Sequence, residues 1–254
     1  MYVDTHTHYY DGRYEGKGAE AIRRSLEAGV GLMLQADVDS LERPAMLSLE
    51  RQFPDSLRHM LGLYPGSVQE NWRDEIDAWL ACLDGSVVAV GEIGLDYHEG
   101  TDWREAQKEA FRVQLELAAA HDLPVNIHLR DAWEDLLTIL EDCRHLHLRG
   151  NFHCFSGSYE IYERARRAGE FSVGIGGVVT FRNSRLAETV SRIPLEHILL
   201  ETDCPYLAPV PHRGECNEST YIPFIAAAVA RAKGIDTETV ERETTRNAFQ
   251  LFAL

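Results

Sequence analysis

The stretch PVNIHLRDAWEDLLTILEDCRHLHLRGNFHCF, residues 124–155, decides the fold. It holds two short apolar runs, 124–129 and 148–155, on either side of a longer amphipathic segment, 132–143. The runs have the length and composition of strands that are buried on both faces, and the segment between them has the length of a helix. A strand–helix–strand unit of this kind predicts two parallel strands joined by a helix.

The same alternation continues in both directions until it fills the chain. Six more strands are predicted at 2–8, 30–36, 58–64, 87–93, 171–179 and 198–202. Helices are predicted at 19–28, 40–53 (with Asp39 or Ser40 as N-cap), 74–83, 103–121, 159–168, 184–191, 219–233 and 237–252. A doubly wound open sheet usually has fewer strands, and no GxGxxG motif follows the first strand. Eight alternations in 254 residues therefore predict an α/β fold, a (β/α)8 TIM-type barrel forming one domain over residues 1–254.

Composition limits the class of protein further. Apolar residues make up 44% of the chain and charged residues 26%, which is typical of a globular domain with a large core. The longest nearly uncharged stretch, 171–181, has about 11 residues, whereas a membrane helix needs about 20. The N-terminus shows no secretion signal, and five cysteines without a CxxC spacing favour a reducing compartment. We expect a cytoplasmic protein outside the membrane, and a monomer, because a barrel buries its core without a partner.

The formal net charge of −16 excludes one class of function. A stable, non-specific nucleic-acid binder depends on lysine and arginine side chains that displace counterions from phosphates. An enzyme that acts on nucleic acid stays possible, because divalent metals in a cleft supply positive charge locally.

Polar residues gather where five of the predicted strands end. The motifs are DTHTH at 4–8, GEIGLD at 91–96, IHLRD at 127–131, HCFSG at 153–157 and ETDCP at 201–205. In a (β/α)8 barrel the carboxyl ends of the strands form one rim, and the active site lies there. We therefore expect six side chains to converge: His6, His8, Glu92, His128, His153 and Asp203.

This residue set predicts a metal centre. Strand side chains alternate with a period of two, so His6 and His8 point into the barrel mouth together. Imidazoles and carboxylates suit zinc, manganese, iron or nickel, and an oxygen-rich half of such a site also admits magnesium. Six ligands exceed what one tetrahedral zinc uses, so two adjacent ions are expected. Glu92 would bridge them around a shared water, and Asp203 would ligate one ion and orient or deprotonate that water. Such a site predicts metal-assisted hydrolysis of an ester or amide.

The motifs DTHTH, GEIGLDY, PVNIHLRDA, HCFSG and ETDCPYL resemble those of the TatD family of metal-dependent hydrolases, among the amidohydrolase-like barrels. The resemblance covers essentially the whole chain. It implies a TIM-type barrel with two divalent ions (Mg, Mn or Zn) and, for several members, 3′–5′ exodeoxyribonuclease activity on single-stranded DNA. By resemblance, His6, His8 and Asp203 hold one metal, His128 and His153 hold the other, and Glu92 bridges the two.

The chain departs from the family pattern at two places. The family commonly shows Gly-x-His-Pro-His after the third strand, but here the run is GLYPG at 62–66, so Tyr64 and Gly66 replace both histidines. That segment is thought to face the substrate, so we expect a different substrate contact. The later RG-x-x-NEP stretch reads RGECNES at 213–219. We expect Ser219 to be the N-cap of the following helix, since serine caps well.

Other polar residues lie next to these motifs, and some of them have two interpretations. Arg130 would bind a substrate phosphate or pair with acids on a helix face. Asp131 is expected to cap the helix that starts at residue 132. Asp96 and Glu201 either steer the histidines or are ordinary buried acceptors. Cys154 and Cys204 lie one residue out of register with the ligands and are expected to pack. The other histidines, at 59, 98, 121, 145, 147, 197 and 212, are expected at the surface or at helix ends. For His98 and His212, which lie in loops at the carboxyl rim, contact with the substrate is the alternative.

The functional hypothesis is a two-metal hydrolase that acts on the 3′ end of short single-stranded DNA, with Glu92 and Asp203 as its catalytic carboxylates. One alternative keeps the metals and changes the substrate to a carboxylic ester or amide, such as aminoacyl-tRNA or a cyclic amide. A third hypothesis is a non-enzymatic quality-control protein with a structural metal, although a structural site needs only four ligands.

Overall fold

The computed structural model describes residues 1–98 and 102–254. Within them, eight strands form one parallel sheet in the order β1 to β8. The strands are β1 (Tyr2–Thr7), β2 (Val30–Gln35), β3 (Leu57–Leu61), β4 (Val87–Asp96), β5 (Val125–Arg130), β6 (Arg149–Phe152), β7 (Glu170–Ile175) and β8 (Ile198–Leu200). The segment after β8 returns to β1, where the Asp203 N–H donates to the His6 carbonyl at 3.1 Å. The predicted (β/α)8 barrel is therefore confirmed.

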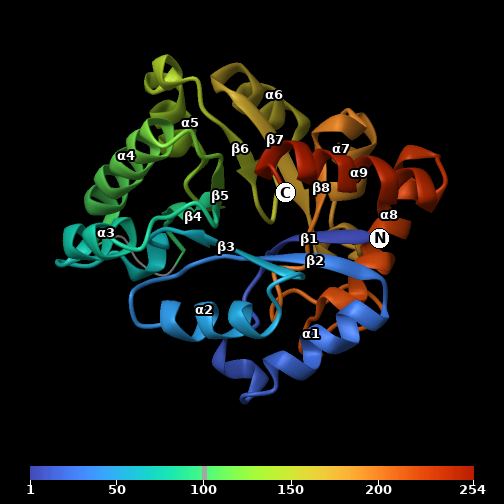
Figure 1. The fold of residues 1–254 in the computed structure, drawn as a ribbon. Helices are drawn as coiled ribbons and strands as arrows, with labels where there is room; N and C mark the ends of the chain where they lie inside the picture. The colour runs from blue at the N-terminus through green and yellow to red at the C-terminus, as the bar shows by residue number, and fades with distance from the viewer. Residues whose placement is uncertain (99–101) are drawn as a thin grey trace.

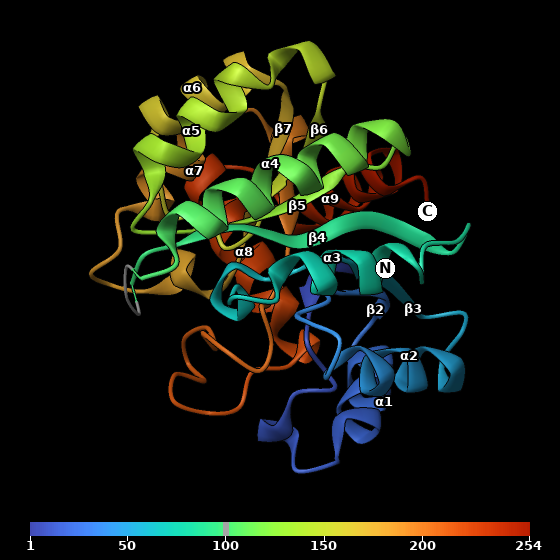
Figure 2. The same ribbon diagram turned by 90° about the vertical axis from the view of Figure 1, so that its left-hand side faces the viewer.

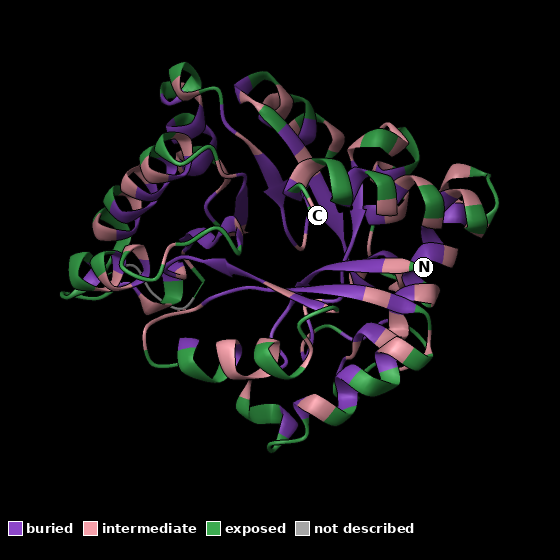
Figure 3. Ribbon diagram, in the orientation of Figure 1, coloured by how far each residue is buried: buried purple, intermediate pink, exposed green. Residues whose placement is uncertain are grey.

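Helices surround the strands (Figure 1). They are α1 (Gly18–Glu27), α2 (Arg43–Gln52), α3 (Trp72–Leu80), α4 (Arg104–Ala120), α5 (Trp133–Asp142), α6 (Tyr159–Ala168), α7 (Leu186–Arg192), α8 (Ile222–Lys233) and α9 (Thr237–Phe252). Figure 2 shows α3, α4 and α5 covering one side of the strands. Apolar side chains of these helices, such as Trp79 of α3 and Phe111 of α4, are fully buried. The strands are buried while the outer faces of the helices are exposed (Figure 3), as expected for a covered parallel sheet.

The barrel interior has an apolar half and a polar half. Val3, Leu34, Met60 and Leu199 form a small cluster inside the strands, and Phe252 of α9 packs against it. The polar half lies at the carboxyl ends of the strands, where every predicted site motif falls. The apolar half fills the barrel, and the polar side chains at the carboxyl rim are the ones available for a functional site.

Several predicted boundaries differ from those in the structure. Strands β3, β6 and β8 end at Leu61, Phe152 and Leu200, earlier than predicted. Helix α8 begins at Ile222, and Ser219 is not its N-cap. The buried Ser219 hydroxyl instead donates to Asp4 Oδ2 at 2.6 Å.

The two other predicted caps are also wrong. Helix α2 begins at Arg43, and the Asp39 carboxylate accepts backbone N–H groups in the turn before it. Helix α5 begins after Ala132 without a side-chain cap. The Asp131 backbone is left-handed, with φ 54°, and its carboxylate accepts from His98 Nδ1 at 3.0 Å. Among the described residues, no helix is long and apolar enough to cross a bilayer.

Candidate metal centre

Six side chains from five strand ends meet at the carboxyl rim of the barrel. His6 lies on β1 and His8 directly follows it; Glu92 lies on β4 and His128 on β5, His153 follows β6 and Asp203 follows β8. All are buried except His128 and Asp203, whose side chains are 14% exposed. The structure thus brings the complete predicted set together.

Glu92 lies between two pairs of histidines. Its Oε2 is 3.4 Å from His6 Nε2 and 3.5 Å from His8 Nε2. Its Oε1 is 2.6 Å from His128 Nδ1 and 2.7 Å from His153 Nε2. One carboxylate oxygen of Glu92 therefore faces each histidine pair.

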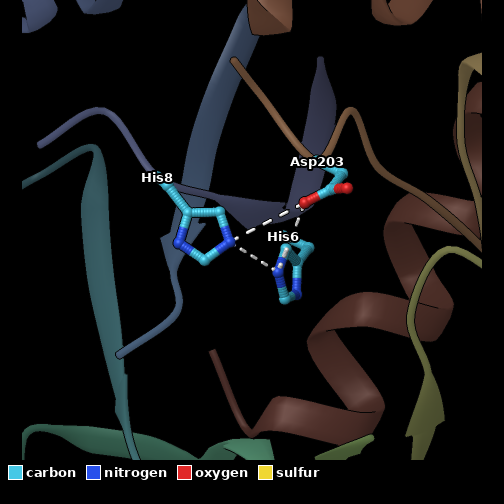
Figure 4. Close-up of side chains that lie close together, drawn as sticks. All are labelled: His6, His8 and Asp203. Atoms are coloured by element: carbon cyan, nitrogen blue, oxygen red, sulfur yellow. Dashed lines mark hydrogen bonds and ion pairs between the residues drawn. The ribbon is translucent and has the colours of Figure 1, made fainter. Parts of the chain in front are cut away.

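The first cluster consists of His6, His8 and Asp203 (Figure 4). The two Nε2 atoms are 3.0 Å apart, and Asp203 Oδ1 is 3.7 Å from each of them. Ligands that lie about 2.0–2.2 Å from a tetrahedral zinc ion are roughly 3.3–3.6 Å from one another. The cluster therefore has the size of a single-ion site.

Hydrogen bonds to the other ring nitrogens show why a cation fits there. Asn126 Oδ1 accepts from His6 Nδ1 at 2.9 Å, because the Asn126 amide nitrogen donates to Asn151. The Tyr10 hydroxyl donates to the Ala36 carbonyl, so it accepts from His8 Nδ1 at 2.9 Å. In the neutral rings these bonds place both protons on Nδ1 and leave the two Nε2 lone pairs facing each other. A metal ion between them removes that repulsion.

The second cluster contains His128 and His153. His128 Nδ1 is 3.1 Å from His153 Nε2. Asp96 Oδ2 accepts from His128 Nε2 at 3.0 Å, a contact that fits the interpretation that Asp96 steers this ring. Glu201 Oε1 is 3.9 Å from His153 Nδ1 and accepts the Cys154 backbone N–H. Two histidines and Glu92 give this cluster three donor groups.

In the metal-free site, the two histidines of each pair have very different pKa values. Burial lowers the pKa of His6, but Glu92 and Asp203 raise it by a larger amount, so that it is about 9. Burial and the neighbouring His6 lower the pKa of His8 to about 4. The second pair divides in the same way. Burial lowers the pKa of His128, but Asp96 and Glu92 raise it by more, to about 9. Burial and the neighbouring His6 lower the pKa of His153 to about 3. Near neutral pH, each histidine pair of the metal-free site thus contains one positively charged imidazolium, which faces Glu92.

Sequence reasoning missed the residues that hold the histidines. Asn126 and Asn151 are fully buried, and Asn126 contacts His6 directly. Each asparagine stands two residues before a site histidine, in the repeated pattern Asn-x-His at 126–128 and 151–153. The same period of two that pairs His6 with His8 could have placed both asparagines inside the barrel.

A cavity of about 730 Å³ opens above the cluster. Arg130 lines it and is exposed, and no carboxylate of the described residues lies within 4.0 Å of its guanidinium. Cys154 also lines the cavity, so the prediction that it packs is wrong. Its left-handed backbone, φ 47°, turns it out of the strand register from which that prediction came. Cys204 is buried in the core as expected.

Tyr64 occupies the wall of this cavity. Its hydroxyl donates to Asp96 Oδ2 at 3.3 Å, and its ring meets the His128 ring edge-on at 5.0 Å between centroids. A Cβ atom on residue 66 would lie 2.3 Å from Tyr64 Cε1. Gly66 therefore leaves room for the Tyr64 ring, and these two replacements within the 62–66 segment fit together.

The other histidines lie outside this cluster. His145 and His147 are exposed, as expected. His59 is not a surface residue: it lies buried on β3, and its Nδ1 is 2.5 Å from Glu50 Oε2. Its position on β3 directs the side chain toward α2, and the hydrogen bond to Glu50 offsets the cost of burying a polar ring.

A (β/α)8 barrel with histidine clusters on both sides of one carboxylate is the architecture of a barrel hydrolase that uses divalent metal ions. The sequence profile described as TatD related DNase matches residues 3–253. The chain belongs to the TatD family and is a metal-dependent hydrolase.

Similar proteins agree with this assignment. The metal-dependent hydrolase YabD of Bacillus subtilis is 35% identical over 257 residues and both chains are fully covered. The 3′-5′ ssDNA/RNA exonuclease TatD of Erwinia tasmaniensis is 37% identical over 243 residues, covering 92% of this chain and 93% of that protein. The crystal structure of YJJV, a TatD homologue of Escherichia coli, superposes with a TM-score of 0.89 at 28% identity, covering 100% of this chain and 98% of that one.

Proposed function

We propose that the protein is a 3′–5′ exonuclease that removes nucleotides from short single-stranded DNA with the help of two divalent metal ions. The observation that carries the proposal is Glu92, whose two oxygens face two separate histidine pairs. The TatD relative of Erwinia tasmaniensis, named as an ssDNA/RNA exonuclease, supports the substrate class.

The residues divide into two ligand sets. His6, His8 and Asp203 would hold one ion, His128 and His153 the other, and Glu92 would contact both. When bound, the ions supply a lowered pKa for an attacking water and positive charge that offsets the phosphate. The donors are imidazole nitrogens and carboxylate oxygens, which fit Zn²⁺ or Mn²⁺, and Mg²⁺ on the more oxygen-rich side.

Two protein side chains would act beside the ions: Asp203 on the attacking water and Arg130 on the substrate phosphate. Asp203 lines the cavity, so its carboxylate is placed to accept a proton from the attacking water. Its side chain is 14% exposed toward the cavity. Arg130 lines the same cavity with its guanidinium free of carboxylates in the described residues, and it would bind a phosphate oxygen of the substrate.

A 5′-labelled and a 3′-labelled single-stranded oligonucleotide test the proposal. Protein stripped by a chelator and reloaded with Mg²⁺ or Mn²⁺ is expected to give a single-nucleotide ladder from the 3′ end. Glu92→Gln is expected to lose at least 100-fold in rate, because its amide cannot bridge two cations. Glu50→Gln is the matched control, since it changes a glutamate that pairs with a histidine outside the site. Absence of cleavage with two ions bound, or release from the 5′ end, would overturn the proposal.

A carboxylic ester or amide is the second candidate substrate. It is favoured by Tyr64, a phenol that stands where the family commonly has a histidine, and by the net charge of −16. The same metal-loaded protein that leaves DNA intact would then hydrolyse an aminoacyl ester or a cyclic amide. The non-enzymatic hypothesis is disfavoured by membership of a hydrolase family. We further propose that residues 1–254 form one domain, since all eight described strands share one sheet.

A further inference from the structure

A second hollow of about 340 Å³ adjoins the metal-site cavity. Arg13, Tyr206 and Leu207 line both, so the two spaces lie next to each other at these residues. The far end of the second hollow is lined by Phe181 and Arg213. A chain-like substrate whose end reaches the histidines therefore has a path past Arg13 toward Arg213.

Two arginines in this hollow are held on aromatic rings. The Arg13 Cζ lies 4.4 Å from the centre of the Tyr206 ring, and the Arg213 Cζ lies 3.9 Å from the centre of the Phe181 ring. Tyr206 is itself fixed, because its hydroxyl donates to Asp11 Oδ2 at 2.6 Å. Stacking orients a guanidinium while its N–H edge stays available as a bidentate donor.

Neither guanidinium is neutralised by a carboxylate. In the part of the chain that the structure describes, no Asp or Glu oxygen lies within 4.0 Å of the side-chain nitrogens of Arg13 or Arg213. The two nearby carboxylates have other donors. Asp11 accepts from Tyr206 and from the Arg13 backbone N–H, and Glu215 accepts from His212 and Tyr221. An acidic protein thus presents two positively charged groups beside its candidate metal centre.

We infer that this hollow, the arginine subsite, binds the backbone phosphates of the nucleotides on the 5′ side of the scissile bond. This inference rests on the proposed exonuclease function. Arg13 and Arg213 would each contact a phosphate, while Leu207, 44% exposed, offers an apolar surface to a base. A dinucleotide with a free 5′-hydroxyl has only the scissile phosphate and leaves the subsite without an anion. The subsite therefore makes the enzyme favour longer chains.

The test compares (dT)2 with (dT)6, both with a free 5′-hydroxyl, on the metal-loaded protein. We expect kcat/KM to be higher for (dT)6, and Arg213→Gln to lower the (dT)6 to (dT)2 ratio by about tenfold, the size of one charged hydrogen bond. Arg213→Lys keeps the charge without the bidentate fork and is expected to fall between the two. Arg182→Gln, a neighbouring exposed arginine that does not line the hollow, is the matched control and should leave the ratio unchanged.

A second readout follows from counterion release. The slope of log kcat/KM for (dT)6 against log salt should become shallower by about 0.7 in Arg213→Gln, because one phosphate contact to a single strand is lost. An unchanged ratio and an unchanged slope in a variant that still cleaves DNA would overturn the subsite and leave the exonuclease intact. Failure of the wild-type protein to cleave either oligonucleotide would overturn the exonuclease function, and with it the subsite.

Discussion

Replacing Asn126 with leucine should weaken the first metal cluster without touching a metal ligand. Asn126 and His6 are both fully buried, and the Asn126 Oδ1 accepts from His6 Nδ1 at 2.9 Å. Leucine has the branched shape of asparagine but is larger, and it removes both the acceptor for His6 and the amide nitrogen that donates to Asn151. The His6 ring must then either bury an unpaired Nδ1–H, at a cost of about 1–3 kcal/mol, or move its proton to Nε2, where the ion binds.

Both outcomes reduce metal affinity by a similar amount. Loss of a hydrogen-bond partner behind a metal-binding histidine typically costs about 10–100-fold in affinity, which is roughly 1.4–2.7 kcal/mol. Asn126→Asp keeps an acceptor for His6 and should bind metal as tightly as the native protein or more tightly. The Asn151 amide nitrogen, which has no partner among the described residues, can turn to donate to the new carboxylate.

Competition for Zn²⁺ with a chromophoric chelator measures the affinity of both variants, and circular dichroism checks that they fold. Equal Zn²⁺ affinity in native protein and folded Asn126→Leu would refute the reasoning that Asn126 sets the proton position on His6. Loss of affinity in Asn126→Asp as large as in Asn126→Leu would show that packing, and not the acceptor, is responsible.

Three further predictions follow from the same site. Glu92→Gln should retain at most one ion per chain after gel filtration, because it lacks the shared negative charge; measured retention of two ions would contradict the bridge. The pKa of His6 and of His128 is raised to about 9 from 6.5, so the metal-free folded protein binds more protons than the unfolded chain. This contribution to the free energy of unfolding is complete below pH 6.5 and is lost as pH rises through 9, by up to about 1.4 kcal/mol per pH unit per proton. A Tm of chelated protein that stays constant or rises from pH 6.5 to 8.5 would be inconsistent with it. Gly66→Ala places a Cβ atom 2.3 Å from Tyr64 Cε1 and should displace the ring, raising KM several-fold; the effect should vanish in a Tyr64→Ala background.

Local patterns were enough to predict the barrel and the cluster. Alternating apolar runs and amphipathic segments have the periods of strands and helices, and these periods depend only on neighbours along the chain. Once the strands are parallel and covered by helices, their carboxyl ends must share a rim. For this reason the positions of Glu92 and Asp203 follow from sequence although 111 residues separate them.

The contacts that adjust the site depend on distant segments. Asn126 reaches His6 across 120 residues of sequence, and Ser219 bonds Asp4 across 215, although serine at that place is also a good helix cap. Cys154 turns into the cavity because its backbone is left-handed, which residue type alone does not indicate.

The sequence by itself therefore determined the fold and which side chains gather, since repeating period and strand direction are local properties. Only the tertiary structure decided which oxygen of Glu92 faces which histidine pair, where the ring protons lie, and how Tyr64 and Gly66 fit together. Those features depend on differences of a few tenths of an ångström in the distances between side chains from different strands, and the packing of the complete barrel fixes them.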